Sequence, residues 1–272
     1  MEPKAVEALR ILSRVLAQER RKFVLIGATV PQIVLDFRES PGGRETRDID
    51  AVAEVASWED FARLRERLLR EGFRPGQVAH ELWFNDEVRI DLIPFGPALV
   101  AEDKLAWPYG DSVMTACGFA EALDCARDQE VASNLTLLVV TIPGLVLTKV
   151  VAYMDRPEER ARDLVDIVYC FDHYEAAIAE SRRFDRAGTD VDGEAVTFEE
   201  AGALLVGMDL AALAKPKSLE IVRRFLAAIP DEFARPVSQI LSEEKRLVDS
   251  EKRRRVLYRL FRVFGAGANQ TG

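Results

Sequence analysis

Two aspartates two residues apart, Asp48 and Asp50, lie in the segment Thr46–Ala53, whose composition is otherwise typical of a β-strand. Because side chains alternate across a strand, both carboxylates are expected on one face and Ile49 on the other. Two carboxylates this close repel each other, and burying them without a counter-charge is unfavourable. A bound divalent cation would relieve both costs, so the pair predicts a metal site.

A third carboxylate follows in a second strand-like segment, Val88–Ile93, where Asp91 alternates with apolar residues. If the two strands pair, three carboxylates converge into the all-oxygen kind of site that Mg²⁺ prefers, completed by water and substrate phosphates. Two ions held by Asp48, Asp50 and Asp91 could orient an in-line attack on phosphorus. The alternative is that Asp48 is a cap and the other two aspartates are solvated residues at a strand edge.

A lysine in a strongly apolar segment is the next candidate. Lys149 is the only charged residue in the run of thirteen that begins at Ile142. A buried ammonium group needs an anion, so Lys149 either pairs with an aspartate or points at a triphosphate. In the next expected helix, Asp163 and Asp166 are three residues apart and share a face. They could line a cleft, or form salt bridges with Lys149 or nearby arginines that fix the two domains.

The order of these motifs resembles the nucleotidyltransferase superfamily of polymerase-β-like enzymes. The matching features are a strand, a Gly-x turn at Gly27-Ala28, a helix, Asp-x-Asp, and a lone aspartate on a later strand. Within that superfamily the chain is most similar to the AbiEii-type nucleotidyltransferases, many of which are toxins of type IV toxin-antitoxin systems. The helical lysine, an arginine-containing turn and the segment Arg160–Ile167 match that family's pattern. The resemblance spans residues 23–171.

The resemblance implies a Mg²⁺-dependent enzyme that transfers a nucleotide from an NTP to an acceptor hydroxyl. The acceptor would be the 3′ end of an RNA such as tRNA, and the protein a toxin restrained by an antitoxin. Asp48 and Asp50 would hold two Mg²⁺ ions on the NTP, and Asp91 would bind the second ion and help deprotonate the acceptor. Lys149 would neutralise the triphosphate, with Asp163 positioning Lys149 or the acceptor.

The nucleotide is expected to bind at Gly27, Ala28 and Thr29, together with Lys149 and Asp166. Family members usually have Gly-Ser or Gly-Gly at the first two positions. Ala28 still offers a backbone N–H and Thr29 a hydroxyl, so a phosphate could bind at the start of the following helix.

The stretch before Asp-x-Asp is also longer than is usual in the family. The extra residues Glu39–Glu45 contain a proline and two glycines and predict a loop beside the site. Such a loop could be a lid, a specificity loop or a neutral insertion.

Two other functions fit the same acids. The chain could transfer a nucleotide to a small hydroxylated molecule, as antibiotic-modifying relatives do, and an acidic cleft would attract a cationic acceptor. Alternatively, Ala28 and the lengthened loop could mark an inactive module that binds a nucleotide or a partner.

Composition excludes several classes of protein. The 272 residues, 48% hydrophobic and 31% charged, are typical of a soluble globular protein with two domains. The longest apolar stretch, Leu135–Val151, is interrupted by Pro143, Gly144 and Lys149 and does not predict a membrane span. No apolar core of a signal peptide follows the N-terminus, so a cytoplasmic location is expected. Three cysteines without Cys-x-x-Cys spacing argue against a disulfide framework or structural zinc.

The net charge of −9 argues against general coating of nucleic acid. A local exception is the basic run Lys252–Arg262, which carries six positive charges and no acid. It could dock a tRNA or an acidic partner, or be an amphipathic helix packed by Val256, Leu260 and Phe261.

The apolar periodicity predicts an α/β fold, with a nucleotidyltransferase-type mixed sheet and flanking helices in residues 1–142. A helical domain in residues 143–272 would complete the active-site cleft. The strands expected are Lys22–Ile26, Asp48–Val55, His80–Asn85, Glu87–Pro94 and Leu135–Thr141, and the helices expected are Val6–Arg21, Thr29–Phe37, Trp58–Arg70, Gly144–Met154, Pro157–His173, Tyr174–Arg183, Phe198–Val206, Ser218–Ala228 and Asp231–Phe264.

Overall fold

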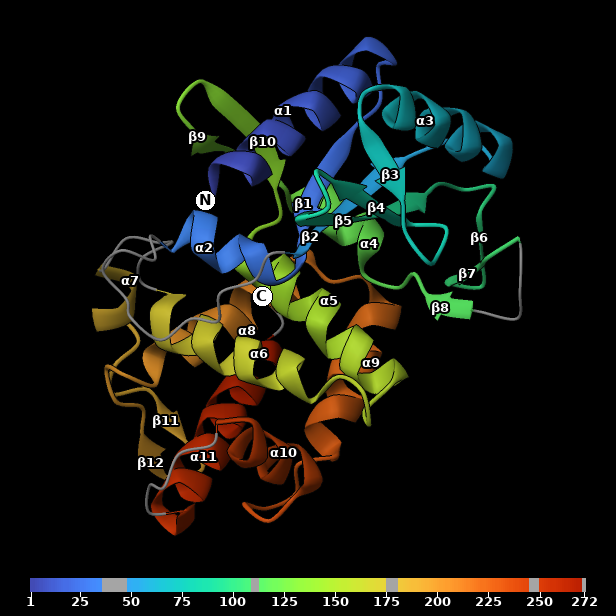
Figure 1. The fold of residues 1–272 in the computed structure, drawn as a ribbon. Coiled ribbons are helices and arrows are strands. Elements are labelled where there is room, and N and C mark those ends of the chain that lie inside the picture. Colours follow the sequence, from blue (N-terminus) through green and yellow to red (C-terminus); the bar gives the residue numbers. More distant parts are fainter. Residues whose placement is uncertain (36–47, 109–112, 175–180, 245–249, 271–272) are drawn as a thin grey trace. The chain divides into compact units, whose positions relative to one another are not determined.

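The computed structural model of the chain describes residues 1–35, 48–108, 113–174, 181–244 and 250–270, and Figure 1 draws it as a ribbon. The chain divides into two compact units, residues 1–33 with 44–141 and residues 34–43 with 142–272. Among the described residues, no helix has both the length and the apolar character that a membrane crossing requires.

The first unit is built on a mixed sheet, which has seven strands in the described residues, in the order β3-β4-β5-β2-β1-β10-β9. Its elements are α1 (Pro3–Gln18), β1 (Phe23–Ile26), the 3-10 turn η1 (Gly27–Thr29), α2 (Val30–Val34), β2 (Asp48–Glu54), α3 (Trp58–Arg70), β3 (Phe73–Pro75), β4 (Glu81–Phe84), β5 (Val88–Phe95), α4 (Phe119–Cys125), β9 (Arg127–Ala132) and β10 (Leu135–Val139), with a small separate sheet of β6 (Val100–Ala101), β7 (Lys104–Ala106) and β8 (Val113–Thr115).

The centre of this sheet is parallel where β2 lies beside β5 and where β1 lies beside β10, and its other pairs are antiparallel. Helices α1 and α3 lie side by side over one face of it (Figure 1). The alternation in β2 and β5 turns Ile49 and Ile90 toward the core, where both are buried. Their neighbours Asp48, Asp50 and Asp91 therefore belong to the opposite face.

The second unit is helical, as the sequence predicts, and the fold class is confirmed. Its elements are α5 (Ile142–Asp155), α6 (Ala161–His173), α7 (Ser181–Phe184), the hairpin of β11 (Asp190–Val191) and β12 (Glu194–Ala195), α8 (Ala201–Leu213), α9 (Pro216–Ala227), α10 (Arg235–Glu244) and α11 (Ser250–Ala268).

Several element predictions need correction. The single helix predicted for Asp231–Phe264 is two helices, α10 and α11. The helix predicted from Pro157 begins only at Ala161, because residues 157–159 form a turn. The helical turn predicted from Thr29 starts at Gly27 as 3-10 structure. The predicted loop Glu39–Glu45 lies outside the described residues.

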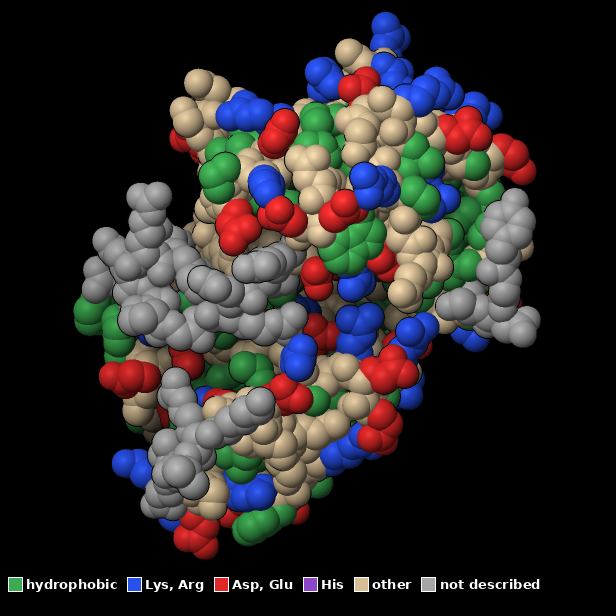
Figure 2. Space-filling view, in the orientation of Figure 1, with side chains coloured by type: hydrophobic (Ala, Val, Ile, Leu, Met, Phe, Trp, Pro, Cys, Tyr) green, Lys and Arg blue, Asp and Glu red, His purple; other side chains and the backbone are tan. Residues whose placement is uncertain are grey.

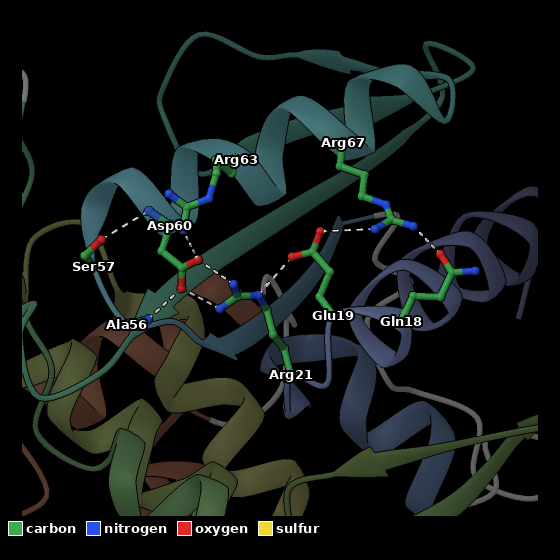
Figure 3. A network of polar contacts seen from close by, with 8 residues as sticks. All are labelled: Gln18, Glu19, Arg21, Ala56, Ser57, Asp60, Arg63 and Arg67. Carbon is green, nitrogen blue, oxygen red and sulfur yellow. Dashed lines mark hydrogen bonds and ion pairs between the residues drawn. The ribbon is translucent and has the colours of Figure 1, made fainter.

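Helix α3 is held to the α1–β1 connection by a network of ion pairs (Figure 3). Ser57 caps the helix by accepting a hydrogen bond from the backbone N–H of Asp60 at 3.2 Å. The Asp60 carboxylate accepts two hydrogen bonds from the Arg21 guanidinium at 2.5 and 2.6 Å, and one from Ala56 N at 2.8 Å. Arg63 pairs with the same carboxylate at 2.9 Å.

This network shifts the ionisation of Asp60, whose side chain is only 5% exposed. The hydrogen bonds from Arg21 hold the pKa of the Asp60 carboxyl below its usual range, against the opposing effect of burial. Asp60 therefore contributes fully to stability above its ordinary pKa, and the contribution is lost as the pH falls through the lowered value.

We expect Asp60→Asn to lower the free energy of unfolding at pH 7 by about 3 kcal/mol, because it leaves Arg21 without its carboxylate partner. Urea denaturation at several acidic pH values and at pH 7 would measure the free energy of unfolding of both proteins. The difference from the wild type should narrow as the pH falls through the lowered pKa of Asp60, where the carboxyl is itself protonated. Asp86→Asn, which breaks the exposed pair with Arg74 at 2.8 Å, is the control and should change stability by less than about 1 kcal/mol.

Candidate active site

The parallel register of β2 and β5 brings the predicted carboxylates together. Asp50 lies directly opposite Asp91, and Asp48 lies opposite Arg89. Paired residues of neighbouring strands point to the same face, about 4.7–4.9 Å apart in backbone spacing. Asp48, Asp50 and Asp91 therefore share one face of the sheet. In Figure 2, acidic side chains gather on the visible face of the first unit, where Figure 1 draws β1, β2, β4 and β5.

A fourth carboxylate extends this row of acids. Glu81 on β4 lies opposite Asp91 in the antiparallel β4–β5 pair, and Trp83 Nε1 donates a hydrogen bond to Glu81 Oε1 at 2.5 Å. The β4–β5 hairpin turns at Asn85 and Asp86, both with positive φ, and the backbone N–H of Glu87 donates to Phe84 O across the turn at 3.2 Å. The sequence predicted the two strands on either side of Asp86, His80–Asn85 and Glu87–Pro94, but did not single out Glu81. The available signal was that Glu81 and Trp83 are two residues apart in a predicted strand, so that their side chains share a face.

Arg89 interacts with the acids from within the same face. Its Nε donates to Asp91 Oδ1 at 3.1 Å and its Nη2 to Asp91 Oδ2 at 2.6 Å. Its Nη1 lies 4.0 Å from Asp48 Oδ2. The hydrogen bond to Asp91 raises the pKa of the Arg89 guanidinium, with burial opposing and the neighbouring carboxylates adding to the effect. Arg89 was not among the predicted site residues, although its position two residues before Asp91 places it on the same face.

Gly27 lies against the Asp50 carboxylate. Ile26 on β1 is paired with Asp50, and the chain then turns at Gly27 with φ +76°. A Cβ at this position would lie 2.0 Å from Asp50 Oδ2. Only glycine leaves room for the carboxylate and adopts this φ without strain. The predicted Gly-x turn therefore sets the position of Asp50.

Ala28 and Thr29 complete the turn η1 beside Asp50. The Thr29 side chain is buried, and its hydroxyl makes no hydrogen bond with the described residues. Helix α2, which follows, has only five residues. The phosphate-binding role of Gly27, Ala28 and Thr29 stays a prediction.

The donor chemistry of this face fits Mg²⁺, because carboxylate oxygens are its preferred protein ligands. In the described ranges, however, no three Asp, Glu, His or Cys side chains stand close enough to hold an ion by themselves. Arg89 already bonds both oxygens of Asp91. Metal binding by Asp48, Asp50 and Asp91 therefore stays a prediction that requires substrate oxygens or a rearrangement of side chains.

Lys149 and its partners form a separate buried cluster in the second unit. Lys149 Nζ donates to Asp163 Oδ1 at 2.9 Å and to Asp166 Oδ2 at 2.6 Å, and the lysine side chain is only 7% exposed. Burial would lower the pKa of Lys149, but the charges of the two aspartates and their hydrogen bonds raise it above its usual value. The ion pair left open by the sequence is thus formed. The nucleotide roles of Lys149, Asp163 and Asp166 stay predictions.

The basic run Lys252–Arg262 forms part of α11, whose apolar face packs on α8. Leu260 and Phe261 are buried as predicted, but Val256 is 41% exposed and does not belong to that face. Several of its arginines make contacts within the unit. Arg253 pairs with Glu244 at 2.5 Å, and Arg262 pairs with Asp192 at 2.8 Å. These contacts give much of the run a structural role.

Comparisons with known proteins give only remote likenesses. No protein-family model matches the sequence, and no curated protein matches it. Similar solved structures include the antibiotic-resistance factor ANT(2'')-Ia, at 14% identity over 68% of this chain and 95% of that chain, with a TM-score of 0.36. A proposed nucleotidyltransferase from H. pylori is 13% identical over 100% of both chains, with a TM-score of 0.42. JHP933 from Helicobacter pylori is 12% identical over 99% of this chain and 96% of that chain, with a TM-score of 0.37. Likeness at this level does not decide what the chain does.

Gly27→Ala tests whether the backbone at Gly27 positions a ligand carboxylate. The methyl group would displace Asp50, so Mg²⁺-dependent NTP binding should fall by more than tenfold, on the order of 2 kcal/mol, while stability falls by roughly 1–2 kcal/mol from the positive φ. Calorimetry and urea denaturation measure the two effects. Gly188→Ala is the matched control, because Gly188 has φ +87° but no heavy atom of the described residues within 4 Å of its Cβ position. Unchanged binding by Gly27→Ala would mean that Asp50 is not a ligand.

Lys149→Met tests the buried cluster of the second unit. Removing the ammonium group leaves Asp163 and Asp166 close together without their shared cation, so we expect a loss of about 3–5 kcal/mol of stability at pH 7. In the wild type, the ion pairs of Lys149 contribute fully to the free energy of unfolding below the usual lysine pKa of about 10.4. This contribution is lost as the pH rises through the raised pKa of Lys149.

Urea denaturation would measure the free energy of unfolding of Lys149→Met and of the variants that follow. Adding Asp163→Asn and Asp166→Asn to Lys149→Met should restore much of the stability, since no charge then remains unpaired in the cluster. Lys4→Met, which removes an exposed pair with Glu87, should have little effect. If Lys149→Met is as stable as the wild type, the ion pairs do not hold this unit together.

Proposed function

We propose that the protein is a nucleotidyltransferase that transfers a nucleotide from an NTP to an acceptor hydroxyl. The observation that carries the proposal is the cross-strand pair of Asp50 and Asp91, with the backbone of Gly27 packed against Asp50. This arrangement presents carboxylates from two adjacent strands on one face, beside a glycine turn with backbone amides. Reactions of a triphosphate need carboxylates that bind metal ions and N–H groups that donate hydrogen bonds to phosphate oxygens. These two kinds of group must lie close together.

In this proposal Asp48, Asp50 and Asp91 hold Mg²⁺ together with the triphosphate. When bound, two Mg²⁺ ions would neutralise charge on the phosphates and favour an in-line attack. Asp50 is oriented by the glycine turn, and Asp91 accepts the proton of the attacking hydroxyl. The backbone amides of Ala28 and Thr29 would donate to phosphate oxygens.

The acceptor is the less constrained part of the proposal. On the family resemblance alone, we propose the 3′ end of an RNA such as tRNA, in the cytoplasm, with an antitoxin protein as the partner that restrains the activity. A small cationic acceptor is the second candidate. It is favoured by the excess of acids on the candidate face, where Asp48, Asp50, Glu81 and Asp91 outnumber Arg89.

Transfer assays separate these acceptors. The protein would be incubated with labelled NTPs and Mg²⁺, and with total RNA, purified tRNA or a panel of hydroxylated amines. Label that appears on RNA supports the RNA-directed reading, whereas label on a small amine supports the second candidate. Absence of transfer to any acceptor, with NTP binding retained, would leave only a nucleotide-binding module.

Asp50→Asn should strongly weaken Mg²⁺-dependent NTP binding while leaving the fold intact, because the amide has one oxygen and no charge for the ion. Calorimetry with and without a chelator would show a loss of at least tenfold in affinity, on the order of 1.4 kcal/mol. The control is Asp128→Asn on β9, an exposed aspartate of the same unit, which should bind as the wild type does. If the wild type binds NTP equally well with and without the chelator, the proposal of a metal-dependent reaction loses its basis.

A further inference from the structure

The Arg89–Asp91 pair lies where the proposed function requires a metal ligand to be available. The guanidinium binds Asp91 side-on, with one nitrogen on each carboxylate oxygen, at 3.1 and 2.6 Å. It also approaches Asp48 to within 4.0 Å. A single side chain thus faces two of the three predicted ligands.

The same face would be electrostatically unfavourable without a cation. Asp50, Asp91 and Glu81 occupy directly opposed positions on three adjacent strands, and like charges at such positions repel. Arg89 supplies a positive charge at that point, and its two-bond geometry makes the contact stronger than a single hydrogen bond. The pair resembles what a divalent cation would do for the same oxygens.

The arginine can also leave. Its side chain is 34% exposed, whereas that of Asp91 is 13% exposed. A long, partly exposed side chain can rotate into solvent while the aspartate remains on its strand. A metal ion at Asp91 would repel the guanidinium and compete for the same carboxylate oxygens, so the two cations cannot both be bound there at full strength.

We propose that Arg89 is a positioning residue that acts as an internal counter-cation: it holds Asp91 in place when no metal is bound and is displaced when a divalent cation binds. The inference rests on the proposed function, because it requires Asp91 to be a metal ligand. Under this proposal, Arg89 sets the metal affinity of the site, because it competes with the ion for Asp91 on the same strand.

Metal binding without nucleotide tests this inference directly. Titration calorimetry with MgCl₂ and with MnCl₂ would compare the wild type with Arg89→Met, which has a neutral side chain of similar reach. We expect roughly tenfold tighter binding by the variant, the effect of removing a charge-assisted pair that the ion must break. Thermal unfolding should show a lower Tm than the wild type in chelator and a larger rise on adding metal.

Two further variants make the result specific. Arg89→Lys keeps the charge but cannot bind both oxygens side-on, so its metal affinity should fall between those of the wild type and Arg89→Met. Its result decides the question if Arg89→Met does not fold. Arg74→Met is the matched control, because Arg74 also contacts both oxygens of an aspartate, Asp86, but away from the acids. It should bind metal as the wild type does.

The outcomes separate this inference from the proposed function. If the wild type binds metal and Arg89→Met binds it equally or more weakly, Arg89 does not compete with the ion and the inference is wrong, while nucleotide transfer is untouched. If neither protein binds metal, with or without NTP, both the inference and the metal-dependent reaction fail. Weaker NTP binding by Arg89→Met at unchanged metal affinity would make Arg89 a phosphate ligand instead.

Discussion

The parallel pairing of β2 with β5 is the constraint on which the candidate site depends. Because side chains alternate with a period of two, a slip of one residue would move Asp50 from Asp91 to the level of Ile90 or Leu92 and break up the acidic row. The register is fixed from the other side of the sheet, where Ile49 and Ile90 are buried in the core beneath α1 and α3. Apolar burial therefore decides which carboxylates meet, although no apolar residue takes part in the chemistry.

Parallel strands cannot be joined by a tight turn, so the chain must cross over between β2 and β5. It does so through α3, β3 and β4, and two of these elements serve the site. Strand β4 returns beside β5 and contributes Glu81. Helix α3 is fixed by the Arg21–Asp60 pair to the segment that enters β1. An ion pair outside the row of acids thus fixes the helix that follows β2.

The sequence predicted the parts of the fold that have strong periodicity or clear caps. Helix Trp58–Arg70 was predicted with its observed bounds, since Ser57 marks its start. The region from residue 98 to 128 gave no pattern, because its strands β6, β7 and β8 have only two or three residues each. A period cannot be detected in so few positions. The boundary between α10 and α11 was missed because neither proline nor glycine marks it.

For the site, the sequence identified which acids share a face but not which cations meet them. Alternation alone places Asp48 with Asp50 and permits Asp91 to join them, and the register bears out that arrangement. The partner of each acid depends on strand order and side-chain conformation, which no spacing encodes. That is why Arg89 went unnoticed, and why the ion pairs that Lys149 forms with Asp163 and Asp166 could be given only as one of two alternatives.

The two clusters use the same physics with opposite consequences. In each, a basic side chain forms hydrogen bonds to aspartate: Lys149 in the second unit and Arg89 on the face of the sheet. Lys149 is almost completely buried and bonded to two carboxylates, so removing it would expose two charges to a medium that solvates them poorly. Arg89 is one-third exposed and bonded side-on to one carboxylate. Water can therefore solvate the guanidinium in place of Asp91 at a much lower cost in free energy. A cation that is exchangeable in this sense suits the face proposed to bind ions and phosphates, whereas the buried lysine holds two carboxylates of its own unit together.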